Sequence, residues 1–356
     1  MKFLRAQSTL LLVLAGMALS LTPLRLPHLS RELLFVVLLP PLLLEGAFAL
    51  PWTGLKRDLP VISLLATLGV LISTLVVALG MHALLQWPWQ SALLLGALTA
   101  ATDPVAVLAL FKQVPVPPRL RLLVEAESLL NDGTASLLFL VFAHEETSLP
   151  SHVLETLEVV LGSAFVGLLL GGLVLLVNRL LPNRWLLVAL ALLGACLPLV
   201  VVQASGVFVP LVMGHFLGNR LLPVQRLAAQ KILENVAMAA NAVVFLLLGA
   251  QLLGQLGQPS VVMLAAIGLT LLGRALAVYP LCLPFARTRM RVPRVQQHVL
   301  VWGGLRGALA LALATEAGRD PGVLTATFAV VAFSVFVQGT TVAWVAPPVD
   351  ELSPKP

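Results

Sequence analysis

Long apolar runs alternate with short polar connections along the whole chain. About 20 apolar residues span the hydrocarbon core of a bilayer, and this rule predicts about twelve transmembrane helices. We expect them at residues 8–26, 32–50, 60–84, 91–111, 121–143, 153–178, 185–203, 206–220, 229–252, 261–284, 298–317 and 323–346. The first run can also be read as a signal peptide cleaved after Ala18-Leu19-Ser20. Because apolar sequence continues past that point, we interpret it as an uncleaved helix.

Composition agrees with an all-α polytopic membrane protein and excludes a soluble domain. The chain is 59% hydrophobic and 11% charged, with a mean hydropathy of +1.00, whereas soluble domains carry about 25% charged residues. The net charge of +6 does not indicate a nucleic-acid partner, because the basic residues lie in short loops between apolar runs. Cys196 and Cys282 fall inside predicted spans and are interpreted as small buried hydrophobic residues. The predicted partner is the lipid bilayer.

The distribution of basic residues predicts the orientation. The alternate loops 51–59, 112–121, 179–184, 220–231 and 285–298, with the two termini, hold 17 of the 22 lysines and arginines. The opposite loops hold only Arg25, Arg31 and Arg319. Lys and Arg are enriched in cytoplasmic loops, so we expect both termini in the cytoplasm of a cell-membrane protein. The loop 144–158, with Glu145 and Glu146, then faces outward.

Two of the predicted helices are interrupted. Thr102-Asp103-Pro104 breaks the fourth span, where Pro104 removes a backbone donor, and Gly303-Gly304-Leu305-Arg306-Gly307 weakens the eleventh. Paired interrupted helices in the two halves of a chain are typical of inverted-repeat transporters with a site near the midplane. We therefore expect one transmembrane domain over residues 1–356, with core helices at roughly 60–143 and 261–346 and the other helices as scaffold or dimer contacts. No soluble domain is expected.

The segment Glu125-Ala-Glu-Ser-Leu-Leu-Asn-Asp-Gly-Thr134 places carboxylates inside a run that is otherwise apolar enough to cross the bilayer. A central Asp costs about 2.5–3.5 kcal/mol on insertion scales, so such residues normally have a function. Helical rise puts Asp132 roughly 16 Å and Asp103 roughly 18 Å into their spans, close to the middle of a core about 30 Å thick. Both carboxylates are predicted to meet there.

Helical spacing sorts the polar neighbours into two stripes. Ser128 and Asp132 share one stripe and Glu127 and Asn131 share the next. Asp132, Asp103, Ser128 and Thr102 offer hard oxygen ligands that suit a small monovalent cation such as Na⁺. Two close carboxylates in a partly dry site do not both ionise cheaply. A proton and a cation therefore compete for the same oxygens, which is sufficient for exchange. No cofactor is expected besides the transported Na⁺ and H⁺.

Three further charged residues lie within or near the predicted site. Arg274 needs a partner, because a lone buried guanidinium is prohibitive, and Glu127 is the candidate. Arg306 can repel cations from a wrong path, stabilise the unwound segment or extend to the interface. Glu45 can cap the polar network or line a cytoplasmic route.

These motifs resemble the first monovalent cation:proton antiporter family of sodium/proton exchangers. The matching segments, in family order, are Leu39-Pro-Pro-Leu-Leu-Leu-Glu45, Ala101-Thr-Asp-Pro-Val-Ala-Val107, Glu127-Ser-Leu-Leu-Asn-Asp-Gly133, Gly273-Arg-Ala-Leu276 and Trp302-Gly-Gly-Leu-Arg-Gly-Ala308. The combination of Thr-Asp-Pro with Glu-Ser-x-x-Asn-Asp-Gly is highly specific, whereas Gly-Leu-Arg-Gly alone is weak.

The resemblance implies an inverted-repeat antiporter fold with two discontinuous crossing helices, a homodimer and elevator-like movement of a six-helix core. It implies that Asp132 is the essential carboxylate, with Asp103, Thr102 and Ser128 around the ion and Glu127 paired with Arg274. Asn131, where electrogenic relatives carry Asp, implies electroneutral one-for-one exchange. Many relatives have thirteen helices and a long regulatory tail; neither the extra N-terminal helix nor the tail is expected here.

Other functions remain open at this point. A K⁺/H⁺ antiporter of the same fold is the nearest alternative to Na⁺ (or Li⁺) exchange, because the sequence does not give the cavity size. An intramembrane aspartyl protease using Asp103 and Asp132 is a remote alternative, and a channel is more remote still, since paired broken helices suit alternating access. We otherwise expect a secondary transporter rather than an enzyme.

Overall fold

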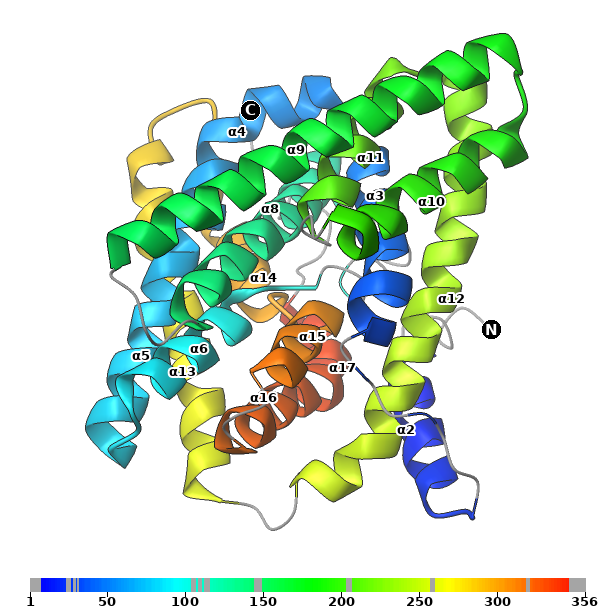
Figure 1. The fold of residues 1–356 in the computed structure, drawn as a ribbon. Helices are drawn as coiled ribbons and strands as arrows, with labels where there is room; N and C mark the ends of the chain where they lie inside the picture. The colour runs from blue at the N-terminus through cyan, green and yellow to red at the C-terminus, as the bar shows by residue number, and fades with distance from the viewer. Residues whose placement is uncertain are drawn as a thin grey trace. The chain divides into compact units, whose positions relative to one another are not determined.

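The structure, a computed structural model, describes residues 8–23, 27, 30, 32–103, 107, 111, 116–143, 149–202, 207–256, 260–317 and 321–345. Within these residues the regular structure is helical (Figure 1), apart from one isolated bridge between Asp103 and Leu305. The first-half helices are α2 (Ser8–Ser20), η1 (Leu33–Leu38), α3 (Leu39–Ala49), α4 (Trp52–Leu64), η2 (Leu65–Gly69), α5 (Val70–Leu85), α6 (Trp89–Ala100) and α8 (Pro118–Ala143). The remaining helices are α9 (Leu149–Leu180), α10 (Arg184–Val202), α11 (Phe208–Arg220), α12 (Pro223–Leu256), α13 (Val261–Cys282), η3 (Leu283–Phe285), α14 (Arg294–Trp302), α15 (Ala308–Glu316), α16 (Pro321–Phe333), η4 (Ser334–Gln338) and α17 (Gly339–Val345).

Within the described residues, each predicted span corresponds to a helix, to a run of joined helices or, at the fourth and eleventh spans, to helix followed by a break. The all-α polytopic prediction is therefore confirmed. By length and composition, five helical stretches can cross a membrane: Trp52–Leu85, Leu154–Leu180, Pro223–Leu252, Val261–Phe285 and Gly322–Val342. Several helices are longer than predicted because they continue past the apolar run. The helix predicted over 60–84 begins at Trp52 and includes the polar segment around Arg57. Three π-helical turns, η1, η2 and η4, were not predicted, since a π turn leaves the hydropathy of a span unchanged.

Some predicted features lie outside the described residues. They are Pro104, the acidic Glu145 and Glu146, the connection 204–206 and the basic residues Arg25, Arg31 and Arg319.

The chain divides into two compact units. Unit 1 comprises Met1–His28, Gly54–Ala143 and Phe245–Pro356, and unit 2 comprises Leu29–Thr53 and His144–Val244. Unit 1 contains both segments predicted to form the core, 60–143 and 261–346. The scaffold and dimer roles of the other helices stay predictions.

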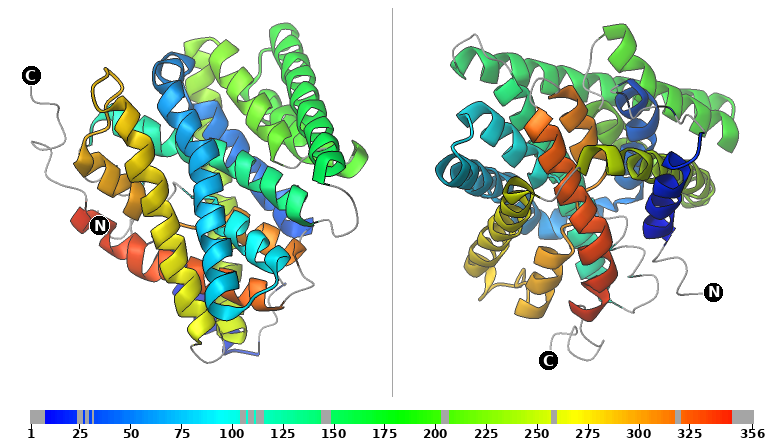
Figure 2. Two further views of the ribbon diagram at one scale, coloured as in Figure 1. Left: turned by 90° about the vertical axis from the view of Figure 1, so that its left-hand side faces the viewer. Right: turned by 90° about the horizontal axis from the view of Figure 1, so that it is seen from below.

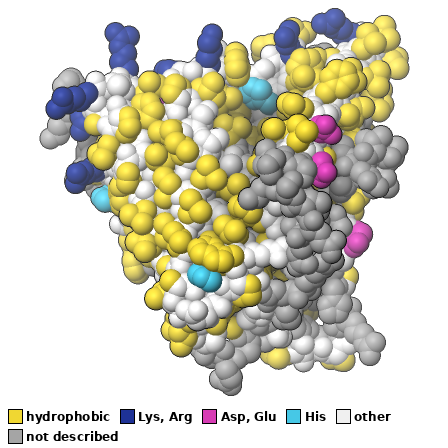
Figure 3. All heavy atoms as spheres, turned by 60° about the vertical axis from the view of Figure 1, so that its left-hand side comes forward, with side chains coloured by type: hydrophobic (Ala, Val, Ile, Leu, Met, Phe, Trp, Pro, Cys, Tyr) yellow, Lys and Arg dark blue, Asp and Glu magenta, His cyan; other side chains and the backbone are white. Residues whose placement is uncertain are grey.

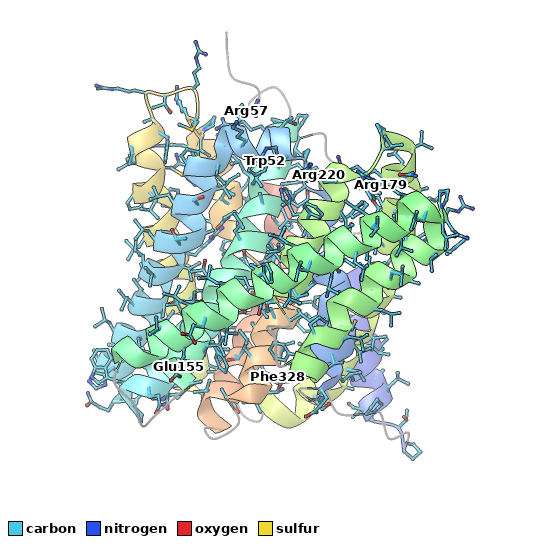
Figure 4. The ribbon with its side chains drawn as sticks, turned by 45° about the horizontal axis from the view of Figure 1, so that its top comes forward. Trp52, Arg57, Glu155, Arg179, Arg220 and Phe328 are labelled. Carbon is cyan, nitrogen blue, oxygen red and sulfur yellow. The ribbon has the colours of Figure 1, made fainter. Side chains whose placement is uncertain are left out.

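Unit 2 is built around an apolar core. α11 packs on α3 and α9, and α10 packs on α9. The core residues are Leu44, Phe48, Val174, Leu187, Val188, Ala191, Ala195, Met213, Leu217, Ala229 and Leu233. α11 approaches α3 closely at Gly218, where a Cβ would overlap the backbone of Phe48. In Figure 4, Glu155 lies toward one end of α9 and Arg179 toward the other.

Unit 1 positions the predicted site. α5 packs on α6 and α13, as Figure 2 shows for α5 and α13, while α6 packs on α8. The contacts are close because Gly96 of α6 faces the backbone of Thr74 and Gly273 of α13 faces that of Ser73. Arg119 donates to Asp58 at 2.9 Å and to the carbonyl of Arg291 at 2.7 Å, so α4, the first turn of α8 and the connection before α14 meet within the unit.

The face drawn in Figure 3 is apolar below a basic edge. On the face drawn in Figure 3, hydrophobic side chains cover most of the described area, and Lys and Arg side chains gather along its upper edge. In unit 1 the exposed side chains include Leu68, Leu71, Leu75 and Leu79 of the η2–α5 helix. An apolar belt of this kind belongs against lipid rather than water, since monomeric soluble proteins rarely expose patches of this extent.

Two helices of unit 1 are interrupted where the sequence predicts. α6 ends at Ala100, and Ala101, Thr102 and Asp103 are non-helical. α14 ends at Trp302 and α15 begins at Ala308, with Gly303–Gly307 between them (Figure 1). The two breaks meet, because the Asp103 N–H donates to the Leu305 carbonyl at 2.7 Å. Non-helical backbone at membrane depth is tolerated only when it is buried in protein or lines a cavity.

Candidate ion-binding site

Asp103 lies directly on the second break. Besides its backbone bond to Leu305, its side chain faces Gly307, where an added Cβ would overlap the Asp103 carboxylate. Gly307 is therefore required for close approach rather than for an unusual backbone conformation, since its φ is −138°. The two interrupted segments bring one carboxylate to their meeting point.

Thr102 is held by α8 through three contacts. Its N–H donates to Asn131 Oδ1 at 3.3 Å, and its Oγ1 accepts from Asn131 Nδ2 at 2.7 Å. Its hydroxyl also lies 3.0 Å from the Ser128 hydroxyl, and either can donate. All three side chains are buried. Asn131, which helical spacing assigned to the neighbouring stripe, thus satisfies a backbone N–H that the break in the fourth span sets free.

Asp132 lies one helical turn beyond Ser128, on the same stripe of α8. Its Oδ1 is buried and has no hydrogen-bond partner among the residues that the structure describes. An uncompensated buried carboxylate oxygen is costly, so such an atom in a native protein calls for an explanation. Binding a cation or a proton supplies one.

Glu127 and Arg274 form the ion pair expected from the sequence. Arg274 Nη1 donates to Glu127 Oε1 and Nη2 donates to Oε2 at 2.8 Å, a bidentate arrangement between α13 and α8. Arg274 also donates to the Leu300 carbonyl of α14, from Nε at 3.2 Å and from Nη2 at 3.0 Å. Both side chains are buried. Glu127 is thus paired with Arg274, whereas Asp132 Oδ1 has no hydrogen-bond partner in the part of the chain that the structure describes.

Arg306 contacts the unwound segment. It is 3% exposed, and its Nη1 donates to the Gly304 carbonyl two residues away. Gly304 in turn lies against the side chains of Arg274, Arg306 and Thr102. Of the three roles considered for Arg306, extension to the membrane interface is excluded by this burial, and stabilisation of the break has a direct contact.

The comparisons with known proteins identify the family. The family model described as "Sodium/hydrogen exchanger, transmembrane" matches residues 1–347. The chain belongs to the sodium/hydrogen exchanger family. It is therefore a multi-pass membrane transporter and not an enzyme, and the aspartyl protease alternative is set aside.

Curated relatives in this family match most of the chain. The chain is 34% identical to the Na⁺/H⁺ antiporter ApNhaP of Aphanothece halophytica, over 94% of this chain and 68% of that protein. It is 33% identical to the low-affinity Na⁺/H⁺ antiporter NhaS1 of Synechocystis, over 98% of this chain and 70% of that protein. The solved structure of the sodium proton antiporter MjNhaP1 from Methanocaldococcus jannaschii at pH 8 has a TM-score of 0.78 and 23% identity, over 95% of this chain and 91% of that one. The chain thus has the antiporter fold.

One predicted residue lies in the other unit. Glu45 is in α3, within unit 2, so its proposed place beside the site stays a prediction. The other predicted residues all lie in unit 1, in or beside the two breaks and on the facing turns of α8 and α13. Sequence reasoning missed the Leu300 and Gly304 carbonyls, because a backbone acceptor carries no residue-type signal.

Proposed function

We propose that this exchanger family member carries Na⁺ or Li⁺ in exchange for protons at a site centred on Asp132. The observation that carries the proposal is the buried Oδ1 of Asp132, which has no hydrogen-bond partner among the described residues and lies one turn of α8 from the Ser128 that contacts Thr102. The relatives named as Na⁺/H⁺ antiporters support the choice of ions.

Asp132, Asp103, Ser128 and Thr102 are the proposed ion ligands. Carboxylate and hydroxyl oxygens are hard ligands that suit a small alkali cation better than a soft metal. Thr102 Oγ1 already accepts from Asn131 Nδ2, so it keeps one lone pair for an ion when its own O–H donates to Ser128 Oγ. In that arrangement Ser128 Oγ also keeps one lone pair. We propose that four further residues position the two breaks relative to α8: Glu127, Asn131, Arg274 and Arg306.

Exchange of one cation for one proton follows from the charges. Glu127 is paired with Arg274, and residue 131 is a neutral Asn whose side chain is hydrogen-bonded to Thr102. If Asp132 alone changes its load, it carries either one cation or one proton, and net charge movement is zero. Alternating access then needs only that the same site faces each side of the membrane in turn.

The proposal extends to assembly and orientation in the cell membrane. α9 exposes Leu161, Phe165, Leu169 and Leu173, an apolar surface that suits lipid or a second copy of the chain in a homodimer. The basic connections support cytoplasmic termini. The mass of the detergent-solubilised protein tests the dimer, and labelling of a Thr288→Cys variant with an impermeant maleimide in right-side-out and inverted vesicles tests the orientation.

Proton flux in proteoliposomes tests the function. Purified protein is reconstituted with a pH-sensitive dye, and Na⁺, Li⁺ or K⁺ is added with and without a potassium–valinomycin clamp. We expect a Na⁺- or Li⁺-driven signal that the clamp leaves unchanged. It should vanish in Asp132→Asn and persist in Glu158→Gln, the same chemical change at an exposed carboxylate of α9.

Three results would change the proposal. A signal with K⁺ alone keeps the mechanism and replaces the cation. A signal that depends on the clamp contradicts one-for-one exchange. Wild-type activity in a folded Asp132→Asn variant removes Asp132 from the centre of the site.

A further inference from the structure

The last transmembrane span contains a polar π-helical turn that the proposed ion site does not use. η4 (Ser334–Gln338) interrupts the α-helical run between α16 and α17. Ser334 and Gln338 are 1% and 3% exposed, and Ser334 Oγ donates to Gln338 Oε1 at 2.9 Å. π turns in membrane and soluble helices occur frequently at functional sites. This one fixes the orientation of a buried carboxamide.

Gln338 bonds to the broken eleventh span. Its Nε2 donates to the carbonyl of Trp302, the last residue of α14, at 3.0 Å. A second bond joins α14 to the same span, since Trp302 Nε1 donates to Thr341 Oγ1 of α17 at 2.9 Å. The final carbonyls of a helix lack partners within the helix, and in a membrane each unsatisfied one costs several kcal/mol.

The carbonyls around this break are satisfied from several directions. Arg274 donates to the Leu300 carbonyl and Arg306 donates to the Gly304 carbonyl. The Asp103 N–H donates to the Leu305 carbonyl. Trp302 is the position that Gln338 satisfies. Among these partners Gln338 comes from η4, an element that contributes none of the predicted ion ligands.

The first half of the chain contains the same device. Asn131 of α8 accepts from the Thr102 N–H at the break of the fourth span. α8 is the helix that follows the fourth span, 91–111. The α16–η4–α17 helix follows the eleventh span, 298–317, in the same way. Each broken span therefore bonds to one buried carboxamide from the next helix along the chain. Asn131 accepts from the Thr102 N–H in the first half, and Gln338 donates to the Trp302 carbonyl in the second.

We propose that Gln338 is a positioning residue for cation binding and the second-half counterpart of Asn131. It fixes the end of α14 and, through Gly303–Gly307, the surface on which the Asp103 carboxylate rests. It does not touch the ion. This inference rests on the proposed function and assigns to it a residue from an element that holds none of the predicted ligands.

Isosteric removal of the carboxamide tests the inference. Gln338→Met keeps the length of the side chain and removes both the amide donor to Trp302 and the amide acceptor from Ser334. The matched control is Gln297→Met, because Gln297 is also a buried glutamine and donates to a backbone carbonyl, that of Val292, at 2.8 Å, but away from the break. Gln338→Met loses the bonds to Trp302 and from Ser334, whereas Gln297→Met loses the bond to Val292. We expect Gln338→Met to lose more thermal stability, so the discriminating measurement is the KM for Na⁺ and not stability.

The two variants should differ in cation binding. We expect Gln338→Met to raise the apparent KM for Na⁺ about tenfold, equivalent to about 1.4 kcal/mol, with little change in maximal rate. Thermal stabilisation by added Na⁺ should weaken in parallel. Gln297→Met should keep the wild-type KM. Should Gln338→Met fail to fold, Ser334→Ala and Thr341→Val each remove one supporting bond and should raise KM about two- to threefold.

Two outcomes contradict the inference alone: an unchanged KM in Gln338→Met, or an equal rise in Gln297→Met. If Gln338→Met does not fold, an unchanged KM in both supporting variants contradicts it. Absence of cation-driven proton flux in the wild type overturns the proposed function itself, and the two failures are therefore distinguishable.

Discussion

The charges of the site are divided between one fixed pair and one available carboxylate. Glu127 receives both terminal nitrogens of Arg274, whereas Asp132 Oδ1 has no partner among the described residues. Removing one partner of a buried ion pair destabilises a protein far more than removing both, because the remaining charge is left uncompensated. Glu127 is therefore suited to hold structure and Asp132 to change its load.

A double-mutant cycle tests this division. We expect Arg274→Ala to lower the free energy of unfolding by about 3–5 kcal/mol, because it leaves Glu127 buried and unpaired. The double variant Glu127→Ala/Arg274→Ala should be more stable than Arg274→Ala alone. Thermal unfolding of the purified variants measures both effects, and absence of any rescue contradicts the pair's proposed role.

At the scale of elements, the two interrupted helices are the feature that the sequence predicted best. α6 ends at Ala100, directly before the non-helical Thr102 and Asp103, and the glycine-rich segment separates α14 from α15. Glycine makes such a break predictable because it lowers the cost of leaving the helix. The π turn at Ser334–Gln338 was not predictable in this way. It arises from packing and hydrogen bonding, and its sequence contains neither Pro nor Gly.

Gly307 allows a direct test of how the breaks meet. We expect Gly307→Ala to reduce Na⁺ affinity roughly tenfold, about 1.4 kcal/mol, because the new Cβ would displace the Asp103 carboxylate. The control is Gly268→Ala in α13, where an added Cβ meets nothing within 4 Å. The readout is the apparent KM for Na⁺ in proteoliposomes. Equal values for both variants would show that the Asp103–Gly307 contact does not set ion affinity.

At the scale of the whole molecule, hydropathy and charge were sufficient for the class and the order of helices. They did not give helix ends such as Trp52, since polar residues continue a helix beyond the bilayer core. They also did not assign Asn131 to Thr102, because helical spacing gives a direction but not a distance across helices. Family motifs pointed to the candidate ligands, and the backbone acceptors became visible only in three dimensions.

The apparent KM for Na⁺ as a function of pH tests the central claim most directly. If one proton and one cation compete at Asp132, lowering the pH protonates the site, so exchange at low Na⁺ falls as the medium becomes more acidic. On the acidic limb KM should rise about tenfold per pH unit, by mass action, while the rate at saturating Na⁺ stays constant. A maximal rate that falls on acidification with an unchanged KM would contradict a shared site.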